Sequence, residues 1–446
     1  MKVPQRPPSL DELFSRVPGD RLATVLRNAS PTSPEGKYRH WETMRRIDPP
    51  GDLSSEEWWL QTKFARRSMM KRLPLTDADG RAFTYALPDP VLAMLHMIDQ
   101  RSSGEISISE VVTNPATRDR YVVNSLIEEA ITSSQLEGAV TSRVVAKEMI
   151  RSGRQPRDVS ERMILNNYHA IHLVRDHRRD QLTPELVCQL QRVLTEDTLD
   201  HERVVGRIQQ PDDDRVRVEA MDGGVLHIPP PAVQLPKRLE LMCEFANGDN
   251  QGGFLHPVLR AILLHFWLAY DHPFVDGNGR TARALFYWSM LKQGYWLSEY
   301  LSISRILRAA SAQYGRSFLY TETDDNDTTY FILYQLKVVC RAIDELYKYL
   351  DRKMAEIRNV EVLLKSSVEL NHRQLALLSH ALRQPGGQYT FRSHANSHGV
   401  VYQSARSDLL DLHARGLLER RKSGRAFVFH APPDVAARLR EMTDAA

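Results

Sequence analysis

Residues 272–283 read His-Pro-Phe-Val-Asp-Gly-Asn-Gly-Arg-Thr-Ala-Arg, and they connect two apolar segments. The segment before them, 257–270, is apolar on nearly all sides and begins with a proline, which fits the first turn of a buried helix. The segment after them, 281–293, is also apolar and is followed by Gly294, a residue that favours a helix end. The sequence therefore predicts a loop between two core helices that opens at the N-terminus of the second helix.

The two glycines of this loop predict an anion-binding site. Gly277 and Gly279 allow a sharp turn and a close approach of a ligand to the backbone. Their N–H groups, together with the free N–H groups of the following helix, form a concave anion-binding nest. Asn278 can either fix the turn or donate a hydrogen bond to a phosphate oxygen. A phosphate group is therefore the expected occupant of the nest.

Four polar side chains surround this predicted nest. Arg280 and Arg283 are three residues apart on one helix face, and two guanidinium groups fit a polyphosphate. Asp276 offers a hard oxygen ligand that suits a Mg²⁺ ion bridging phosphates. His272 is the nearby group that titrates near neutral pH, so it is the natural general base. A structural turn alone would not require these residue types at fixed offsets, and the set predicts phosphate-transfer chemistry on a nucleotide.

The whole stretch resembles the signature HPFxDGNGRxxR of the Fic family, and every fixed position of that signature is matched. The resemblance implies a Fic core that transfers AMP from ATP to a hydroxyl group of a protein. It implies His272 as the base and Asp276 as the Mg²⁺ ligand. The implied ATP-binding residues are Gly277, Asn278, Gly279, Arg280, Thr281 and Arg283. No P-loop sequence competes with this interpretation.

A second motif lies about one domain's length before the first. Residues 115–138 predict a long helix, because apolar residues recur at helical spacing and Gly138 favours a helix end. Ser133 and Glu137 in its last turns resemble the [S/T]xxxE[G/N] inhibitory motif of Fic proteins. The resemblance implies that Glu137 pairs with Arg283, where a carboxylate would remove a clamp for the γ-phosphate and repel a triphosphate. A solvated glutamate on a capped helix is the alternative.

A break from helical periodicity occurs at 215–228, where charged residues alternate with valines around a Gly-Gly turn. This pattern predicts one β-hairpin flap. In the Fic family the corresponding hairpin holds the backbone of the target protein as an added strand, which an exposed strand edge permits. The implied acceptor is a Ser, Thr or Tyr hydroxyl of that target. In the family the region at 309–329 lines the adenine pocket, and Tyr314 is a candidate residue for it.

The last part of the chain predicts a separate module at 371–433. Helical segments at 373–382, 391–398 and 402–415 precede a hairpin, which is the order of a winged helix-turn-helix domain. From residue 371 onward there are 11 Lys or Arg and 6 Asp or Glu. This basic excess fits contact with the DNA backbone. A role in protein interaction or dimerisation fits the same order of elements.

Composition sets further bounds. The 446 residues carry a net charge of +3 and are 42% hydrophobic, which excludes a strongly basic nucleic-acid scaffold and provides enough apolar residues for about three domains. The three cysteines are far apart in the sequence, which predicts reduced thiols and not disulfides. The N-terminus has no signal-peptide core and the apolar runs are too short to span a bilayer, so a soluble cytoplasmic protein without membrane contact is expected.

These patterns predict a mainly α protein in four parts: a loosely ordered N-terminus at 1–37, an N-terminal helical region at 38–110, a Fic core at 111–355 and a winged helix at 371–433. The predicted activity is protein adenylyl transfer, autoinhibited by Glu137. Three alternatives stay open: transfer of another phosphate-containing group, removal of AMP, and a DNA-binding regulator that uses the Fic core as a nucleotide sensor. The sequence does not decide the oligomeric state, a homodimer included.

Overall fold

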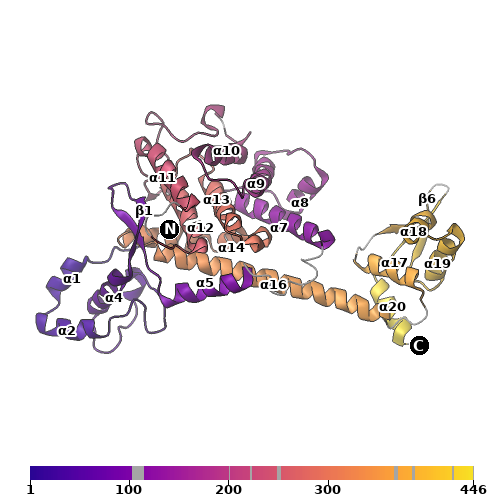
Figure 1. Cartoon of the computed structure of the whole chain (residues 1–446), viewed down its shortest axis with the longest axis horizontal. Coiled ribbons are helices and arrows are strands. Elements are labelled where there is room, and N and C mark those ends of the chain that lie inside the picture. The colour runs from indigo at the N-terminus through magenta and orange to yellow at the C-terminus, as the bar shows by residue number, and fades with distance from the viewer. Residues whose placement is uncertain are drawn as a thin grey trace. The chain divides into compact units, whose positions relative to one another are not determined.

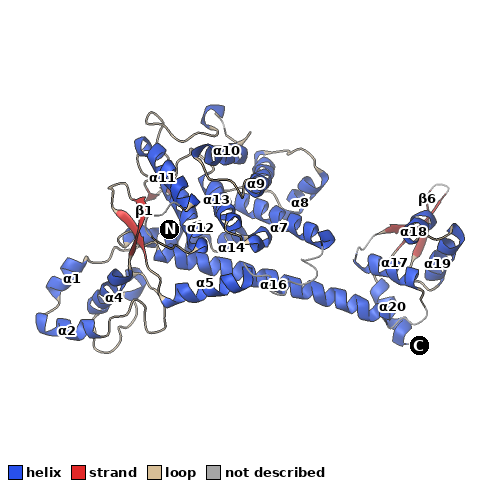
Figure 2. Ribbon diagram, in the orientation of Figure 1, coloured by secondary structure: helices blue, strands red, loops and turns tan. Residues whose placement is uncertain are grey.

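Helices make up most of the structure, as predicted (Figure 1, Figure 2). The chain divides into two compact units, Met1–Leu346 and Tyr347–Ala446. No helix in the described part of the chain is long and apolar enough to cross a membrane. This computed structural model describes residues 1–102, 115–199, 201–220, 223–248, 253–365, 370–383, 387–423 and 426–444.

The core of the first unit is built around two helices, α12 (Pro257–Asp271) and α13 (Asn278–Lys292). Both are buried over almost their whole length, because apolar residues occupy nearly every side of them. Pro257 occupies the first turn of α12, as predicted. The motif at 272–283 therefore forms the connection between two core helices and the first turns of the second.

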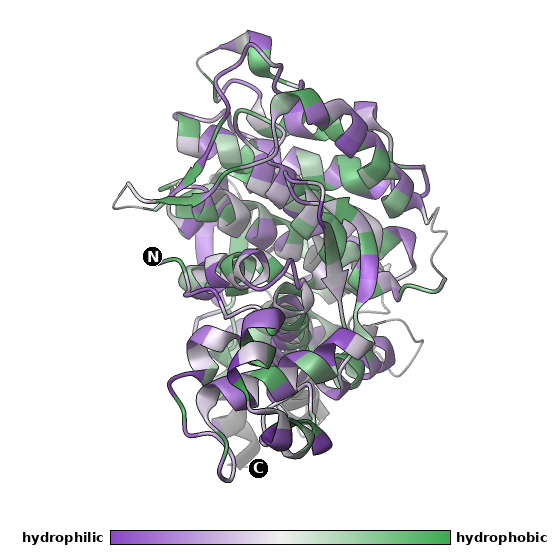
Figure 3. Cartoon of the chain, turned by 90° about the vertical axis from the view of Figure 1, so that its left-hand side faces the viewer, coloured by the Kyte–Doolittle hydropathy of each residue, from purple (hydrophilic) through white to green (hydrophobic). Residues whose placement is uncertain are grey.

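Other helices surround this central pair and position the loop between them. α7, α9 and α10 contact α13, and α11 contacts α12. Figure 3 shows that many helices carry both hydrophilic and hydrophobic residues, as expected for helices that cover a core. The elements are α5 (Asp89–Ser102), α7 (Pro115–Leu136), α8 (Arg143–Ser152), α9 (Val159–Asp176), α10 (Pro184–Thr195), η1 (Glu202–Val204), η2 (Ala232–Gln234), α11 (Leu235–Asn247), η3 (Trp296–Tyr300), α14 (Ile303–Ala309), α15 (Ser311–Thr323) and α16 (Thr329–Lys365).

The N-terminal region is helical, contrary to the loose order expected at 1–37. The Ser9 side chain caps the first helix, and Leu13 and Val25 are fully buried in one apolar cluster with Trp59. Residues 1–37 are rich in proline and charged residues, and this composition led to the expectation of loose order. It does not reveal that the few apolar residues pack against residues further along the chain. The helices are α1 (Leu10–Arg16), α2 (Gly19–Arg27), α3 (Trp41–Met44) and α4 (Ser55–Met69).

The described residues of the first unit contain two β-hairpins, whereas the sequence predicted one. β3 (Val218–Glu219) and β4 (Val225–His227) form an antiparallel pair in the expected place. β1 (Lys71–Thr76) and β2 (Ala82–Tyr85) form a further antiparallel pair. Leu73 and Leu75 of β1 are buried on one face, but Pro74 lies between them. Because a proline argues against a strand in a sequence, this hairpin was not predicted.

The second unit has its own apolar core, which includes Leu378, Leu409, Phe429 and Leu439. Its strands pair antiparallel in the order β5-β7-β6. Because Leu439 is buried in this core, the module extends beyond the predicted boundary at residue 433. The elements are α17 (His372–Arg383), β5 (Gln388–Tyr389), α18 (Phe391–His398), α19 (Tyr402–Ala414), β6 (Glu419–Ser423), β7 (Ala426–His430) and α20 (Val435–Asp444).

A buried arginine joins the N-terminal region to the start of α16. The Arg66 guanidinium donates to the carbonyl oxygens of Pro31 and Arg39, both at 2.9 Å, and to the Tyr330 hydroxyl at 2.7 Å. It also stacks on the Tyr38 ring at 3.5 Å. A buried cation is tolerated only when its donors are satisfied, so this cluster fixes the N-terminal region against the core.

Arg66→Met should lower the free energy of unfolding of the first unit by about 1–3 kcal/mol, because it leaves the carbonyl oxygens of Pro31 and Arg39 without their donor. Arg67→Met changes the exposed neighbour in the same helix and should cost less than about 0.5 kcal/mol. Urea unfolding followed by tryptophan fluorescence reports on this unit alone, since all six tryptophans precede residue 347. Equal unfolding midpoints for the two variants would contradict the prediction.

Candidate functional site

The loop between α12 and α13 is held in shape by its own side chains. α12 ends at His272, whose φ of 46° is left-handed, and α13 follows Gly277, whose φ is 84°. The Asn278 side chain closes the loop by accepting from the Phe274 N–H at 2.9 Å and donating to the Phe274 carbonyl at 2.8 Å. The sequence left two roles open for Asn278, and in the structure its side chain fixes the turn.

Helix α10 supports the same loop. Gln191 donates to the Asp276 carbonyl at 3.0 Å, and a Cβ at Gly277 would lie 2.8 Å from Cγ2 of Thr195. Only glycine fits there, for reasons of both space and backbone angle. The Thr281 N–H donates to the Gly277 carbonyl at 2.8 Å in the first turn of α13. Thr281 is fully buried, so its side chain faces the protein core and not the loop surface.

Arg280 and Asp276 pair with one another. Nη2 of Arg280 lies 2.8 Å from Oδ2 of Asp276, and Nη1 donates to the Leu194 carbonyl at 2.8 Å. The Arg280 side chain is fully buried, whereas the Asp276 side chain is 49% exposed. The guanidinium thus points into the protein, and this orientation differs from the phosphate contact expected from the sequence. A buried guanidinium needs a carboxylate partner, and Asp276 supplies it.

Arg283 is held by the two residues of the second motif. Its Nη2 donates to Oε1 of Glu137 at 2.8 Å and to the Ser133 carbonyl at 3.0 Å, while Nε donates to the Ser133 hydroxyl at 2.9 Å. The Arg283 side chain is only 1% exposed. The contact that the sequence led us to expect between Glu137 and Arg283 is therefore present, across 146 positions of the chain.

The Glu137 carboxylate lies against the first turn of α13. A Cβ at Gly279 would be 2.2 Å from Oε1 of Glu137, so only a bare backbone allows this approach. α13 begins without a side-chain cap, and its free N–H groups form the positive end of the helix dipole. An anionic side chain thus lies beside Gly279, one of the residues that the sequence predicted to bind a phosphate.

His272 is neutral at the end of α12. Its Nδ1 lies 3.3 Å from the Ala269 carbonyl, and because a carbonyl only accepts, that nitrogen carries the proton. Nε2 is then left with a lone pair. Burial, together with the neighbouring His227 and Arg215 charges, lowers the pKa of His272 to about 4, although the hydrogen bond to Ala269 acts in the opposite direction. The ring is therefore in the form that can accept a proton at neutral pH.

Arg215 holds the backbone at His272, a role that the sequence did not indicate. Its guanidinium donates to the carbonyl oxygens of Asp271 and His272, the latter at 2.8 Å, and to the Pro230 carbonyl at 2.9 Å. From the sequence, Arg215 was one of the alternating residues of the predicted hairpin. In the structure it precedes β3 and clamps the left-handed turn that presents the His272 ring.

His227 fixes the β3–β4 hairpin to the core beside this turn. Its Nε2 lies 2.7 Å from the Tyr270 carbonyl and its Nδ1 lies 2.8 Å from the Glu322 carboxylate. Burial lowers the pKa of His227, but the hydrogen bond and charge of Glu322 outweigh this effect and raise the pKa above its usual value. The hairpin is thereby tied to the residue two positions before His272.

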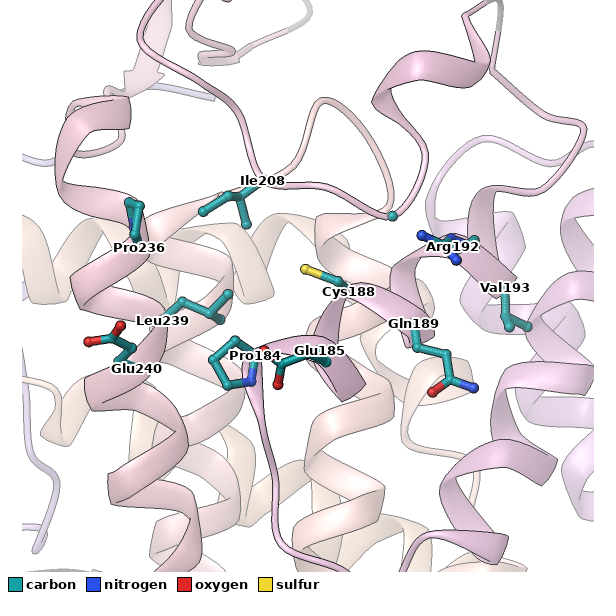
Figure 4. Close-up of a pocket in the computed structure, with 11 residues that line it drawn as sticks. Pro184, Glu185, Cys188, Gln189, Arg192, Val193, Ile208, Pro236, Leu239 and Glu240 are labelled. Atoms are coloured by element: carbon teal, nitrogen blue, oxygen red, sulfur yellow. The ribbon is translucent and has the colours of Figure 1, made fainter.

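A separate cavity of about 760 Å³ lies between α10 and α11 (Figure 4). Cys188 and Arg192 line it from a face of α10 that neighbours the one bearing Gln191 and Thr195. Burial raises the pKa of the Cys188 thiol, which disfavours a reactive thiolate. The lining residues are Pro184, Glu185, Cys188, Gln189, Arg192, Val193, Gly206, Ile208, Pro236, Leu239 and Glu240. None of them belongs to the loop, so the cavity is distinct from the site.

Comparison with known proteins agrees with this geometry. A family model described as Fic/DOC family matches residues 181–290, which include α10, α12 and the loop. The crystal structure of a Fic family protein from Desulfovibrio desulfuricans G20 superimposes with a TM-score of 0.55 at 18% identity, over 78% of this chain and 98% of that one. Residues 181–290 therefore form a Fic/DOC family domain.

Two curated relatives are similar to parts of this chain. Protein adenylyltransferase Fic of Nematostella vectensis is 26% identical over 208 residues, which are 45% of this chain and 45% of the relative. Protein adenylyltransferase Fic of Drosophila grimshawi is 35% identical over 96 residues, 21% of this chain and 19% of the relative. The chain thus spans less than half the length of the curated relatives it matches.

The pKa of His272 should be measured at about 4, so its ring should stay neutral as the pH falls from about 8 to about 5 and become protonated only near pH 4. NMR titration of ¹³C-labelled histidine rings measures this directly, and the His272 signal is assigned by its loss in His272→Gln. A midpoint near about 6.5, the value of an exposed histidine, would show that the ring is not desolvated as the structure indicates.

Proposed function

We propose that this protein is a protein adenylyltransferase that transfers AMP from ATP to a Ser, Thr or Tyr hydroxyl of a target protein. The observation that carries the proposal is the meeting of three features: the uncapped start of α13, the buried Arg283 beside it, and a neutral His272 one loop away. Anion binding next to a base is what phosphoryl-type transfer requires. The similarity to proteins named adenylyltransferase supports the same activity.

In the proposed reaction the target hydroxyl oxygen bonds to the α-phosphorus of ATP. The bond from that phosphorus to the oxygen bridging to the β-phosphate breaks, and pyrophosphate leaves. Nε2 of His272 takes the hydroxyl proton as the new bond forms. Arg215 keeps the ring in position through the carbonyl oxygens of Asp271 and His272. Backbone N–H groups at Gly277 and Gly279 stabilise the charge on the phosphates.

Asp276 is the residue that would hold Mg²⁺. Its side chain is half exposed and its orientation is fixed by Arg280. Among the described residues, no group of three or more His, Cys, Asp or Glu could form a metal site on its own. A single carboxylate fits Mg²⁺, which commonly completes its octahedron with phosphate oxygens and water. When bound, the ion would supply neutralisation of phosphate charge, and the proposed role of Arg280 is to orient Asp276.

We propose that the structure represents a resting state in which Glu137 is inhibitory. Its carboxylate takes Arg283, which would otherwise be available to a γ-phosphate, and lies against the backbone at Gly279. An incoming triphosphate would meet a negative charge in a partly desolvated place, where repulsion is strong. Ser133 holds the same arginine from one helical turn earlier, so movement of the last turns of α7 would free Arg283.

The β3–β4 hairpin is the proposed binding element for the target protein. Its two short strands are antiparallel, and His227 ties β4 to the core next to the His272 turn. Val225 and Ile228 are exposed there, at 41% and 63%. A target segment added as a strand to this hairpin would place its hydroxyl residue near His272.

We also propose that the second unit is a winged helix. The order α17, β5, α18, α19 and then the β6–β7 hairpin, with sheet order β5-β7-β6, supports this fold.

Two other activities would use the same groups, namely transfer of a different phosphate-containing group and removal of AMP with Glu137 acting on water. The intact mass of a target incubated with ATP distinguishes them, because the proposed activity adds one AMP. A nucleotide sensor would bind ATP and leave every protein mass unchanged.

Glu137→Gly should raise auto-modification by ATP about tenfold or more, since a charge-assisted contact of about 1.5–3 kcal/mol no longer holds Arg283. Adding Arg283→Ala should lower the activity again, because the higher activity of Glu137→Gly depends on the arginine that this change frees. Incorporation of labelled AMP into the protein measures both variants beside the wild type.

Gln135→Gly is the control, because it weakens the same helix end and leaves the carboxylate in place; it should stay at the wild-type level. If wild type and Glu137→Gly were equally active, the inhibitory role of Glu137 would be wrong while the transferase proposal would stand.

His272→Ala, made in the Glu137→Gly background, should slow transfer by about 10²–10⁴-fold, the usual contribution of a general base. Its ATP affinity, measured by calorimetry, should change less than about threefold because the ring does not belong to the phosphate nest. Asp276→Ala should behave differently and weaken Mg²⁺-dependent ATP binding as well. An equal loss of affinity and rate in His272→Ala would argue against the base assignment.

A further inference from the structure

Four acidic residues of the second unit pair with arginines in the same unit: Asp408, Asp411, Glu419 and Asp434. Asp408 is 4% exposed and accepts from Arg373 at 2.7 and 3.0 Å and from Asn371 at 2.8 Å. Asp411 pairs with Arg415 at 3.0 Å. Carboxylates that are neutralised in this way contribute little negative potential at the surface.

Several cations of the same unit lie on its surface without such partners. Arg392 of α18, Arg406 of α19, and Arg420 and Lys422 of β6 are all exposed. None of these four forms an ion pair with a carboxylate in the described part of the chain, whereas Arg421 between the last two lies 3.4 Å from Glu419. The surface of the unit is therefore more positive than the numbers of its basic and acidic residues alone would indicate.

The cations of β6 lie on the same side of the sheet as the start of α19. Arg420 is paired in register with Phe429, and Lys422, two residues further, shares its face of the strand. Phe429 is buried and packs on Phe391 at 5.2 Å, and Phe391 packs on Tyr402, the first residue of α19, at 5.7 Å. This chain of ring contacts connects the face of the hairpin that bears Arg420 and Lys422 to the N-terminal end of α19.

The first two turns of α19 present hydrogen-bonding side chains to solvent. Tyr402, Gln403, Arg406 and Ser407 are exposed, while the buried face of the helix consists mainly of Ala405, Leu409 and Leu412 with the paired Asp408. Glutamine, arginine and serine side chains can hydrogen bond to base edges and phosphates. A protein-binding surface would instead be expected to have few charged residues at its centre.

We infer that the second unit binds double-stranded DNA, with the first turns of α19 in the major groove and the cations of β6 on the phosphate backbone. The major groove of B-form DNA admits an α-helix, whereas that of A-form RNA is deep and narrow. Duplex DNA therefore fits this surface better than duplex RNA. The inference depends only on the surface of the second unit, and it is independent of adenylyl transfer by the first.

Fluorescence anisotropy of a labelled random-sequence DNA duplex, titrated with the full-length protein, tests this inference. Binding should weaken steadily between about 50 and 200 mM salt. The triple variant Arg406→Ala, Arg420→Ala, Lys422→Ala should lose about tenfold or more in affinity at low salt. Its slope of log affinity against log salt should be smaller by about two, one for each phosphate contact of β6 removed.

Arg67→Ala, Arg72→Ala, Lys337→Ala is the charge-matched control, because these three cations are exposed on the first unit. It should keep its affinity within about twofold and its full salt slope. Equal weakening by the two triple variants would overturn the assignment of the surface. Absence of salt-dependent binding by the wild type at low salt, or equal affinity for a duplex RNA of the same length, would overturn the inference, and neither result would affect the adenylyl transfer assay.

Discussion

The structure of the first unit depends on two buried guanidinium groups near the start of α13. Arg280 and Arg283 are both almost fully buried, and a buried cation without its partner costs about 3–5 kcal/mol. Asp276 from the loop satisfies the first, and Glu137 from α7 satisfies the second. The shape of the loop and the packing of α7 therefore both depend on arginines of α13. Removal of Glu137 leaves Arg283 without a carboxylate until another anion binds there, and a nucleotide phosphate is an anion of suitable charge.

Sequence spacing did not predict how these two arginines divide their partners. Residues at i and i+3 share a helix face, which is why the sequence suggested that both guanidiniums meet one polyphosphate. The structure instead directs Arg280 towards α10 and Arg283 towards α7. An arginine side chain is long enough to turn to either side of its helix, so spacing fixes the position of the Cα atom and not the partner of the guanidinium. The partner depends on which neighbouring helix offers a carbonyl or carboxylate.

What could be predicted from the sequence was mostly local. The two core helices and the loop between them follow from apolar periodicity, a proline and glycines that lie close together in the chain. The contact between Glu137 and Arg283 came from a family resemblance, because no local pattern links positions 146 residues apart. Arg215 and Arg66 were missed for the same reason: their partners include backbone carbonyls, which any residue provides and no sequence pattern marks.

The charge of the whole chain also says little about either unit. A net charge of +3 over 446 residues is close to neutral, and from the sequence it argued only against a strongly basic scaffold. In the first unit the guanidinium groups of Arg280 and Arg283 are buried against carboxylates and do not reach solvent. In the second unit it is the carboxylates, Asp408 and Asp411, that are paired, and cations such as Arg406 remain outside. Since electrostatic attraction of a polyanion depends on the potential at the surface, two parts of one nearly neutral chain can differ in whether they bind a free nucleotide or a nucleic-acid backbone.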